Sequence, residues 1–276
     1  MTKVLPAEQA IGVFDSGVGG LTVLKAMREL MPAEDLLYLG DTARLPYGTK
    51  SPRSILNYAG QAAAHLQRRQ IKLLVVACNT ASAVALEHLR ESLAPLPVIG
   101  VVEPGAIAAV SKNPAGRHLV LATEATVSLG AYGNAIRGLD ASAKVSELAC
   151  ELLVALAEEG WTHGSVAESI IQKYLEPQLG LPAAERPQSL ILGCTHFPLL
   201  RDAIVAVAGT DVAIVDSART TAAAVEGFMA DRQLARAQHD GSVKLLATDG
   251  ARRFARVGGA FLETSLSAND IELVDL

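Results

Sequence analysis

The sequence predicts an α/β fold built of two similar lobes. Short apolar runs rich in Val, Ile and Leu alternate with Ala-rich and Leu-rich segments at helical spacing. This alternation is typical of parallel strands joined by crossover helices. One run in each half of the chain ends in a cysteine. We therefore expect each lobe to be a mainly parallel sheet flanked by helices, with a ligand site in the cleft between the lobes.

The apolar runs define the expected strands in chain order. Each run has the length of one strand, and the segments between most of them are long enough for a helix. The expected strands are residues 11–15, 36–40, 73–77, 97–102, 118–123, 189–193, 212–216, 243–247 and 271–274.

The arrangement of these strands also predicts how the chain divides. Residues 1–101 are expected to form the first lobe, with the strand that ends at Cys78. Residues 102–209 should form the second lobe, with the strand that ends at Cys194. The tail, residues 210–276, is expected to return to the first lobe, because its strands need a sheet to join.

Composition and charge argue against several kinds of partner. The chain has 276 residues, half of them hydrophobic, so it can bury a large core. Its net charge is −5 and its Lys and Arg residues are scattered, which argues against nucleic-acid binding. No apolar stretch approaches the ~18 residues of a membrane span, and residues 1–10 lack the apolar core of a signal peptide. Three cysteines are an odd number, and with no signal peptide we expect reduced thiols in the cytoplasm. Their spacing has no CxxC pair that would suggest a structural zinc site.

Polar and reactive residues follow the expected strands directly. In open parallel sheets, ligands bind at the carboxyl ends of the strands, so these residues are the first candidates for a site. They are Asp15-Ser16-Gly17, Gly40-Asp41-Thr42, Cys78-Asn79-Thr80, Glu103-Pro104, Thr123, Cys194-Thr195-His196 and Asp216-Ser217.

The turn Gly17-Val18-Gly19-Gly20 has two interpretations. One is a dinucleotide-binding loop. Against it, Thr22 stands where the last glycine of GxGxxG belongs, and no acidic residue ends a second strand about 20 residues further along the chain in the expected setting. The other is a tight turn before a helix that starts near Leu21, whose free N–H groups could hold a carboxylate.

Cys78 and Cys194 are the strongest candidates for reactive groups. If the two lobes face each other, the thiols flank one cleft, and a proton could leave one face of a carbon and return on the other. This is the chemistry of a racemase or epimerase that works without a cofactor. A helix expected over residues 81–89 should stabilise the Cys78 thiolate and move its pKa from ~8.5 toward neutrality. The alternative for either cysteine alone is a small buried hydrophobic residue.

Two polar residues could assist the thiols. His196 lies two residues after Cys194, on the same face of an extended segment, and could help proton transfer or bind a carboxylate. Asp15 could accept the proton of Cys78 or hold an ammonium group. The alternatives are a structural histidine and a helix N-cap at Asp15 or Ser16.

Two other chemistries use the same residues. Zinc could bind Cys78, Cys194, His196 and Asp15, but it would neutralise the thiolates that proton transfer needs. A Cys/His hydrolase needs only one thiol and leaves the second unexplained.

Five motifs, in the same order, resemble the glutamate racemases, and the similarity extends from Ile11 to about Ser217. They are IGVFDSGVGGLT at 11–22, GDTARLPYG at 40–48, ACNTAS at 77–82, VEPG at 102–105 and GCTHFPLL at 193–200.

The resemblance implies an enzyme that interconverts L- and D-glutamate without cofactor or metal and supplies D-glutamate for bacterial peptidoglycan. It implies that Cys78 takes the α-proton from D-glutamate and that Cys194 takes it from L-glutamate. It also places Asp15 beside the first thiol, and His196 with Glu158 beside the second. The substrate contacts that it implies are Asp15, Ser16, Pro46, Tyr47, Gly48, Asn79, Thr80, Thr123, Thr126, Thr195 and His196.

Several expectations accompany this resemblance. No lysine follows the strands in these motifs, so charge and hydrogen bonds in a closed, dry cleft must stabilise the carbanion. Cys150 is expected to be structural, inside a helix and not after a strand. A homodimer is compatible with the sequence. An aspartate, other amino-acid or hydantoin racemase and a non-catalytic carboxylate-binding or regulatory protein stay open as alternatives.

Overall fold

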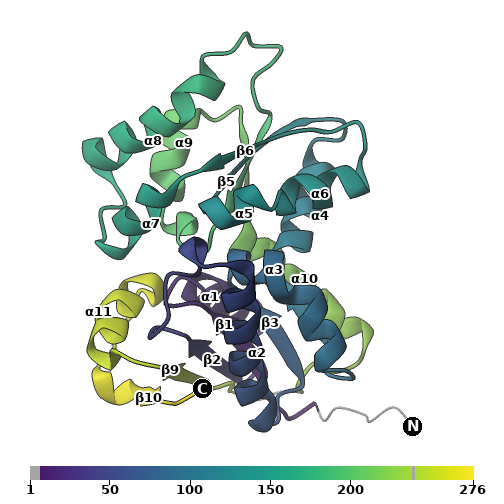
Figure 1. Cartoon of the computed structure of the whole chain (residues 1–276), viewed down its shortest axis with the longest axis vertical. Helices are drawn as coiled ribbons and strands as arrows, with labels where there is room; N and C mark the ends of the chain where they lie inside the picture. The colour runs from purple at the N-terminus through teal and green to yellow at the C-terminus, as the bar shows by residue number, and fades with distance from the viewer. Residues whose placement is uncertain (1–6, 238–239) are drawn as a thin grey trace.

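The structure, a computed structural model, describes residues 7–237 and 240–276 of the chain. Two parallel sheets lie in the two halves of the molecule, and the C-terminal helix lies in the same half as the N-terminal strands (Figure 1). The expected two-lobed α/β class is therefore confirmed. The expectation about a signal peptide falls largely on residues 1–6, outside the described residues. No helix in the described part of the chain is both long and apolar enough to cross a membrane.

The first sheet has six parallel strands in the order β10-β9-β2-β1-β3-β4. Alternate residues of the central strand β1 face opposite layers, because successive side chains of a strand point to opposite faces. Val13 packs in the cluster that includes α1, α10 and α11, whereas Phe14 packs in the cluster with α2 and α3. The strands are β1 (Ile11–Asp15), β2 (Leu36–Gly40), β3 (Leu73–Val76), β4 (Val98–Gly100), β9 (Val243–Ala247) and β10 (Ile271–Leu273). The helices are α1 (Leu21–Leu30), α2 (Pro52–Arg68), α3 (Asn79–Ser92), α10 (Ser217–Asp231) and α11 (Ala251–Leu262), with short 3-10 turns η1 (Tyr47–Thr49) and η3 (Ala268–Asp270).

The second sheet has four parallel strands in the order β6-β5-β7-β8. Leu119 and Leu190 pair in register across the central strands, and both are buried. The strands are β5 (Arg117–Ala122), β6 (Lys144–Ala149), β7 (Ser189–Gly193) and β8 (Ala213–Asp216). The helices are α4 (Val102–Lys112), α5 (Glu124–Ser128), α6 (Ala131–Leu139), α7 (Glu151–Glu158), α8 (Gly164–Leu179) and α9 (Arg201–Ala208), with the 3-10 turn η2 (Phe197–Leu200).

Three features of this lobe differ from the sequence expectations. Strand β6 was not expected, because its sequence KVSELA alternates polar and apolar residues, as an edge strand with partly exposed side chains does. Cys150 therefore follows a strand and caps α7, and is not inside a helix. Strand β8 was expected in the first lobe, but it pairs with β7 through registers such as Leu190 with Ile214. The chain turns back to the first lobe only with α10, whose helix packs on α1.

The two lobes meet at the carboxyl ends of their strands. The Thr22 hydroxyl in α1 donates to the Thr195 carbonyl in the second lobe at 2.9 Å. Gly19 lies at the same contact, and a Cβ atom there would come within 2.3 Å of Thr195 Oγ1 and 2.6 Å of the His196 ring. The glycine is therefore needed for the lobes to approach this closely.

Replacing Gly19 with Ala should separate the lobes at this contact. Cys78 and Cys194 are each only 5% exposed, so we expect iodoacetamide to label them roughly tenfold faster once the contact opens. Mass spectrometry of the labelled peptides would measure the rates. Gly60→Ala is the matched control, because a Cβ atom at Gly60 in α2 meets nothing within 4 Å. Equal labelling of Gly19→Ala and the unmodified protein would contradict the assignment.

Candidate active site

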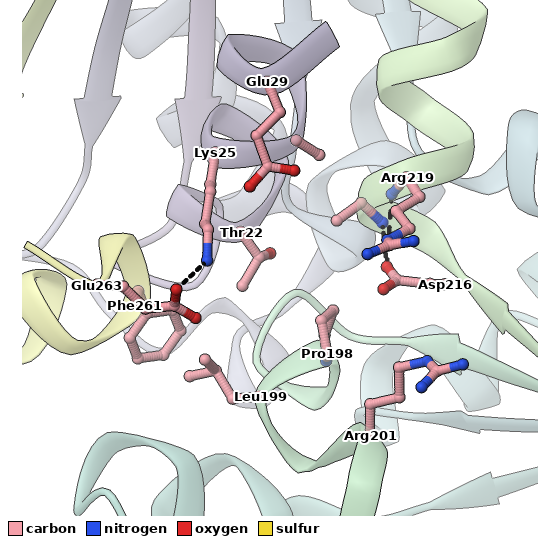
Figure 2. Close-up of a pocket in the computed structure, with 12 residues that line it drawn as sticks. Thr22, Lys25, Glu29, Pro198, Leu199, Arg201, Asp216, Arg219, Phe261 and Glu263 are labelled. Carbon is pink, nitrogen blue, oxygen red and sulfur yellow. Dashed lines mark hydrogen bonds and ion pairs between the residues drawn. The ribbon is translucent and has the colours of Figure 1, made fainter. Parts of the chain in front are cut away.

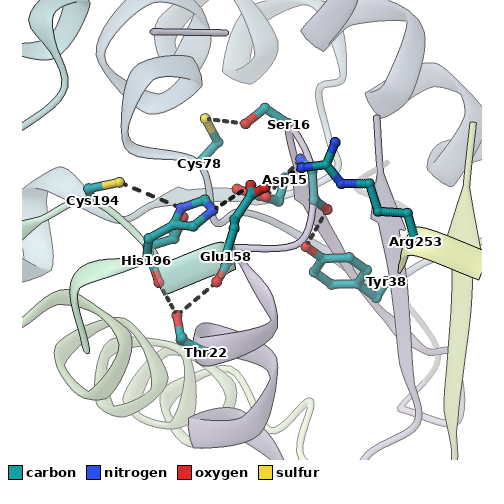
Figure 3. Close-up of polar contacts among 12 residues, drawn as sticks. Asp15, Ser16, Thr22, Tyr38, Cys78, Glu158, Cys194, His196 and Arg253 are labelled. Atoms are coloured by element: carbon teal, nitrogen blue, oxygen red, sulfur yellow. Dashed lines mark hydrogen bonds and ion pairs between the residues drawn. The ribbon is translucent and has the colours of Figure 1, made fainter. Parts of the chain in front are cut away.

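The candidate residues gather where the two sheets face each other (Figure 3). Asp15 ends β1, and Cys78 follows the neighbouring strand β3. In the second lobe Thr123 follows β5, and Cys194 follows the neighbouring strand β7. Each lobe thus contributes a pair of adjacent strand ends, one of which carries a thiol. The three cysteines of the chain are all free.

Cys78 is the N-cap of α3. Its Sγ atom accepts from the Ala81 N–H at 3.4 Å and lies 3.5 Å from Ser16 Oγ. Burial raises the pKa of the Cys78 thiol to about 12, and the nearby Asp15 adds to the rise, while the contacts with Ser16 and Ala81 oppose it. The expected fall of this pKa toward neutrality is therefore wrong. The helix N-terminus is present as expected, but the loss of solvent outweighs it.

Asp15 lies beside this thiol and is 1% exposed. Its Oδ2 atom accepts from the Gly17 N–H at 2.8 Å, while its buried Oδ1 atom has no hydrogen-bond partner among the described residues. Burial raises the pKa of the Asp15 carboxyl, and the charge of His196 acts in the opposite direction. A buried carboxylate oxygen without a donor is costly, so this atom is suited to a cationic or N–H-bearing ligand.

Cys194 begins a chain of polar contacts that crosses the lobe boundary (Figure 3). Its Sγ atom lies 3.8 Å from His196 Nδ1, and His196 Nε2 lies 3.2 Å from Glu158 Oε1. Glu158 Oε2 accepts from Arg253 of α11 in the first lobe at 2.6 Å. Burial lowers the pKa of His196, but the contacts with Cys194 and Glu158 outweigh it and bring the value to about 10. His196 is therefore a cation at neutral pH, and its hydrogen bond in turn lowers the pKa of Glu158.

Three threonine hydroxyls form a cluster from both lobes. Thr80 Oγ1 lies 3.0 Å from Thr123 Oγ1 and 3.4 Å from Thr126 Oγ1, and the last two are 3.0 Å apart. Asn79 directly precedes Thr80 of this cluster. Its Oδ1 atom accepts from the Tyr132 hydroxyl at 2.7 Å, and its Nδ2 atom is buried without a described partner. The cluster and this free N–H group are hydrogen-bond donors for an anionic ligand.

The loop at residues 46–48 offers fewer free polar side-chain groups to a ligand than the other segments of the site do. The Tyr47 hydroxyl donates to the buried carboxylate of Asp41, which also binds Arg44 and Thr248, so it is already engaged. Pro46 is exposed. Gly48 faces Thr123, whose Cβ would lie 3.1 Å from a Cβ atom at Gly48.

Tyr132 and Arg253 also reach the site, although neither is predicted from the sequence. Both lie on helices and not after strands, so neither carried the strand-end signal. Arg253 also borders a cavity of about 230 Å³ that opens beside Glu158 and Phe254. A separate pocket of about 170 Å³ lies at the junction of α1, α10 and η2 (Figure 2). The strand-end candidate Asp216 lines this pocket, and neither thiol does. Within residues 7–237 and 240–276, no three His, Cys, Asp or Glu side chains are grouped to hold a metal ion.

The fold and these residues define a class of protein in which two α/β lobes face each other across buried ionisable groups. Residues 11–225 match the model of the family described as Asp/Glu/Hydantoin racemase. The chain belongs to this family and is a racemase, an enzyme of the isomerase class.

Individual relatives agree with this assignment. A glutamate racemase from Geobacter metallireducens is 47% identical over 255 residues, which cover 92% of this chain and 93% of that protein. A glutamate racemase isoform from Bacillus anthracis matches the structure with a TM-score of 0.91 at 33% identity, covering 98% of both chains. A glutamate racemase from Francisella tularensis in complex with D-glutamate matches with a TM-score of 0.88 at 33% identity, also over 98% of both chains. The resemblance seen in the motifs is therefore confirmed.

Replacing Glu158 with Gln should lower the free energy of unfolding in a pH-dependent way. The folded pKa of His196, about 10, lies above its ordinary value of 6.5, so its protonation stabilises the folded state. This contribution is complete below pH 6.5 and is lost as the pH rises through about 10. We expect a loss of about 2 kcal/mol at pH 6.5 that shrinks by pH 10, measured by denaturant unfolding.

Glu159→Gln is the matched control for this measurement. Glu159 is the exposed neighbour of Glu158 on the same helix end. It should change the free energy of unfolding little at either pH. An equal loss for Glu158→Gln at both pH values would contradict a protonated His196.

Proposed function

We propose that this chain interconverts L- and D-glutamate by moving the α-proton between two cysteines, without a cofactor. The observation that carries the proposal is the position of Cys78 and Cys194, which follow matching strands of two facing sheets around one buried site. Inversion at a carbon needs a base on one face and an acid on the other. One thiolate and one thiol meet this need, and they exchange roles with the direction of reaction.

The two thiols differ in their surroundings, and this sets their roles at the start of a turnover. With a pKa raised to about 12, Cys78 holds its proton at neutral pH and is suited to donate it. The negative charge that Cys194 acquires as a base lies next to the cationic His196. With Cys194 as the thiolate and Cys78 as the thiol, Cys194 removes the α-proton of L-glutamate, and Cys78 protonates the opposite face of the α-carbon to give D-glutamate. The reverse reaction uses the same groups with their protonation exchanged.

The unpartnered polar atoms of the site match the groups of an α-amino acid. Asp15 Oδ1 is a buried acceptor, which we assign to the substrate ammonium. Asn79 Nδ2 is a buried donor, which we assign to a carboxylate. The ammonium also reduces the negative charge next to Cys78, which favours its action as a base toward D-glutamate.

The hydroxyl groups supply the remaining contacts to the two carboxylates of the substrate. We assign these contacts to Ser16, Thr80, Thr123, Thr126 and Thr195, with backbone groups of residues 46–48. Donors aimed at the α-carboxylate strengthen as it takes enolate character, which stabilises the carbanion in a site closed to water. Glutamate is favoured over aspartate because relatives at 39–47% identity are named glutamate racemases. The aspartate racemase from Picrophilus torridus is 17% identical and shares the fold alone.

Three further expectations accompany this proposal. D-glutamate made by the enzyme would supply the peptide part of bacterial peptidoglycan. The enzyme would work in the cytoplasm, where its thiols stay reduced. The homodimer stays a prediction that sedimentation or light scattering would test.

Cys78→Ser and Cys194→Ser should each abolish racemisation while the protein stays folded. Serine is a far weaker acid than cysteine, so neither variant completes the proton exchange, and we expect at least a roughly 10³-fold fall in kcat. The change of the circular dichroism of L-glutamate and D-glutamate measures turnover. The unmodified enzyme in D₂O should introduce deuterium at the α-carbon without an added cofactor.

Cys150→Ala is the control variant, because Cys150 is buried at the end of β6 and takes no part in the proposed chemistry. It should retain turnover. Near-normal turnover in either serine variant would refute the two-cysteine mechanism. A clear preference for aspartate would refute the proposed substrate.

A further inference from the structure

Tyr132 is a buried polar residue that the proposed chemistry does not use. It lies on α6 in the second lobe, is fully buried, and donates through its hydroxyl to Asn79 Oδ1 of the first lobe at 2.7 Å. We propose that Tyr132 is a positioning residue that fixes the orientation of the Asn79 amide, so that Nδ2 faces the substrate carboxylate. This inference rests on the proposed function of the site.

The two ends of the Asn79 amide group differ in their hydrogen-bonding character. An asparagine side chain presents an acceptor and a donor from one planar group, and turning the plane by half a rotation exchanges them. With Oδ1 engaged by the tyrosine, Nδ2 is left buried without a described partner. In the exchanged orientation Asn79 would present an oxygen to the ligand, and this would repel a carboxylate.

The tyrosine is well suited to impose this choice. Burial raises the pKa of Tyr132, so the phenol keeps its proton at neutral pH. A phenol oxygen can also accept a hydrogen bond, but with the amide exchanged the Tyr132 proton would be buried without an acceptor among the described residues. Its ring also has little freedom, because it lies against two glycines. A Cβ atom at Gly105 or at Gly193 would come within 3.0 Å of the ring. These glycines belong to the VEPG and GCTH motifs, so their small size leaves the space that the ring fills.

The hydrogen bond also joins the two lobes. Asn79 begins α3 directly after Cys78, while the ring of Tyr132 packs against Gly193, directly before Cys194. The substrate carboxylate and both thiols therefore depend on the same contact between the lobes. Because Nδ2 of Asn79 is already oriented, substrate binding loses no free energy to turning the amide group.

Tyr132→Phe tests the inference, because it removes the hydroxyl and keeps the ring. We expect KM for both L- and D-glutamate to rise about tenfold, a larger factor than any fall in kcat, since the lost contact is already made when the substrate binds. In an Asn79→Ala background, Tyr132→Phe should have no further effect on KM. Tyr174→Phe is the matched control, because its hydroxyl accepts from the Leu152 N–H in the same lobe but away from the site.

A second variant, Asn79→Asp, keeps an acceptor for Tyr132 but puts an oxygen where Nδ2 was. We expect it to raise KM at least as much as Tyr132→Phe. An unchanged KM in either variant of an enzyme that racemises glutamate would overturn the inference, as would additive effects in the double variant. Absence of glutamate racemisation in the unmodified enzyme would instead refute the proposed function.

Discussion

The site depends on the contact between the carboxyl edges of the two sheets. Hydrogen bonds from Thr22 to Thr195 and between Thr80 and Thr123 cross this boundary, and the absence of a side chain at Gly19 lets the edges approach. Both thiols are buried here, and Cys194 lies near enough to Cys78 for its charge to act on that thiol across the boundary. Burial in turn produces the shifted pKa values of the site, since the loss of solvent is the main influence on Cys78 and Asp15.

The charges around the two thiols are opposite in sign, and each lobe supplies the charged group beside its own thiol. Cys78 lies near the carboxylate of Asp15, whereas Cys194 lies beside the cationic His196, which Glu158 supports. Arg253 completes this chain from the other lobe, so the charge state of His196 depends on both lobes. A proton-transfer pair needs one protonated and one ionised member, and the raised pKa of Cys78 suits that thiol to the protonated role. In the same site, Tyr132 fixes the orientation of a neutral group, the amide of Asn79.

Most strands and most residues of the candidate site could be predicted from the sequence, because each apolar run marks a strand and the polar residues directly after it mark the strand end. The apolar runs located nine of the ten strands in the described part of the chain, and the residues that follow β1, β3, β5 and β7 all lie at the site. Strand β6 was missed because a half-exposed edge strand lacks an apolar run. The pKa of Cys78 depends on how completely the lobes bury it, which no local pattern reports. Tyr132 and Arg253 reach the site from helices through long-range contacts, so only the structure identified them.

The central claim is that two thiols act on opposite faces of one α-carbon. A crystal structure of this enzyme with D-glutamate bound is the most direct measurement. The account predicts that the Sγ atoms of Cys78 and Cys194 lie on opposite sides of the α-carbon, each about 3.5 Å from it. Two sulfur atoms on the same side, or glutamate bound away from them, would contradict it.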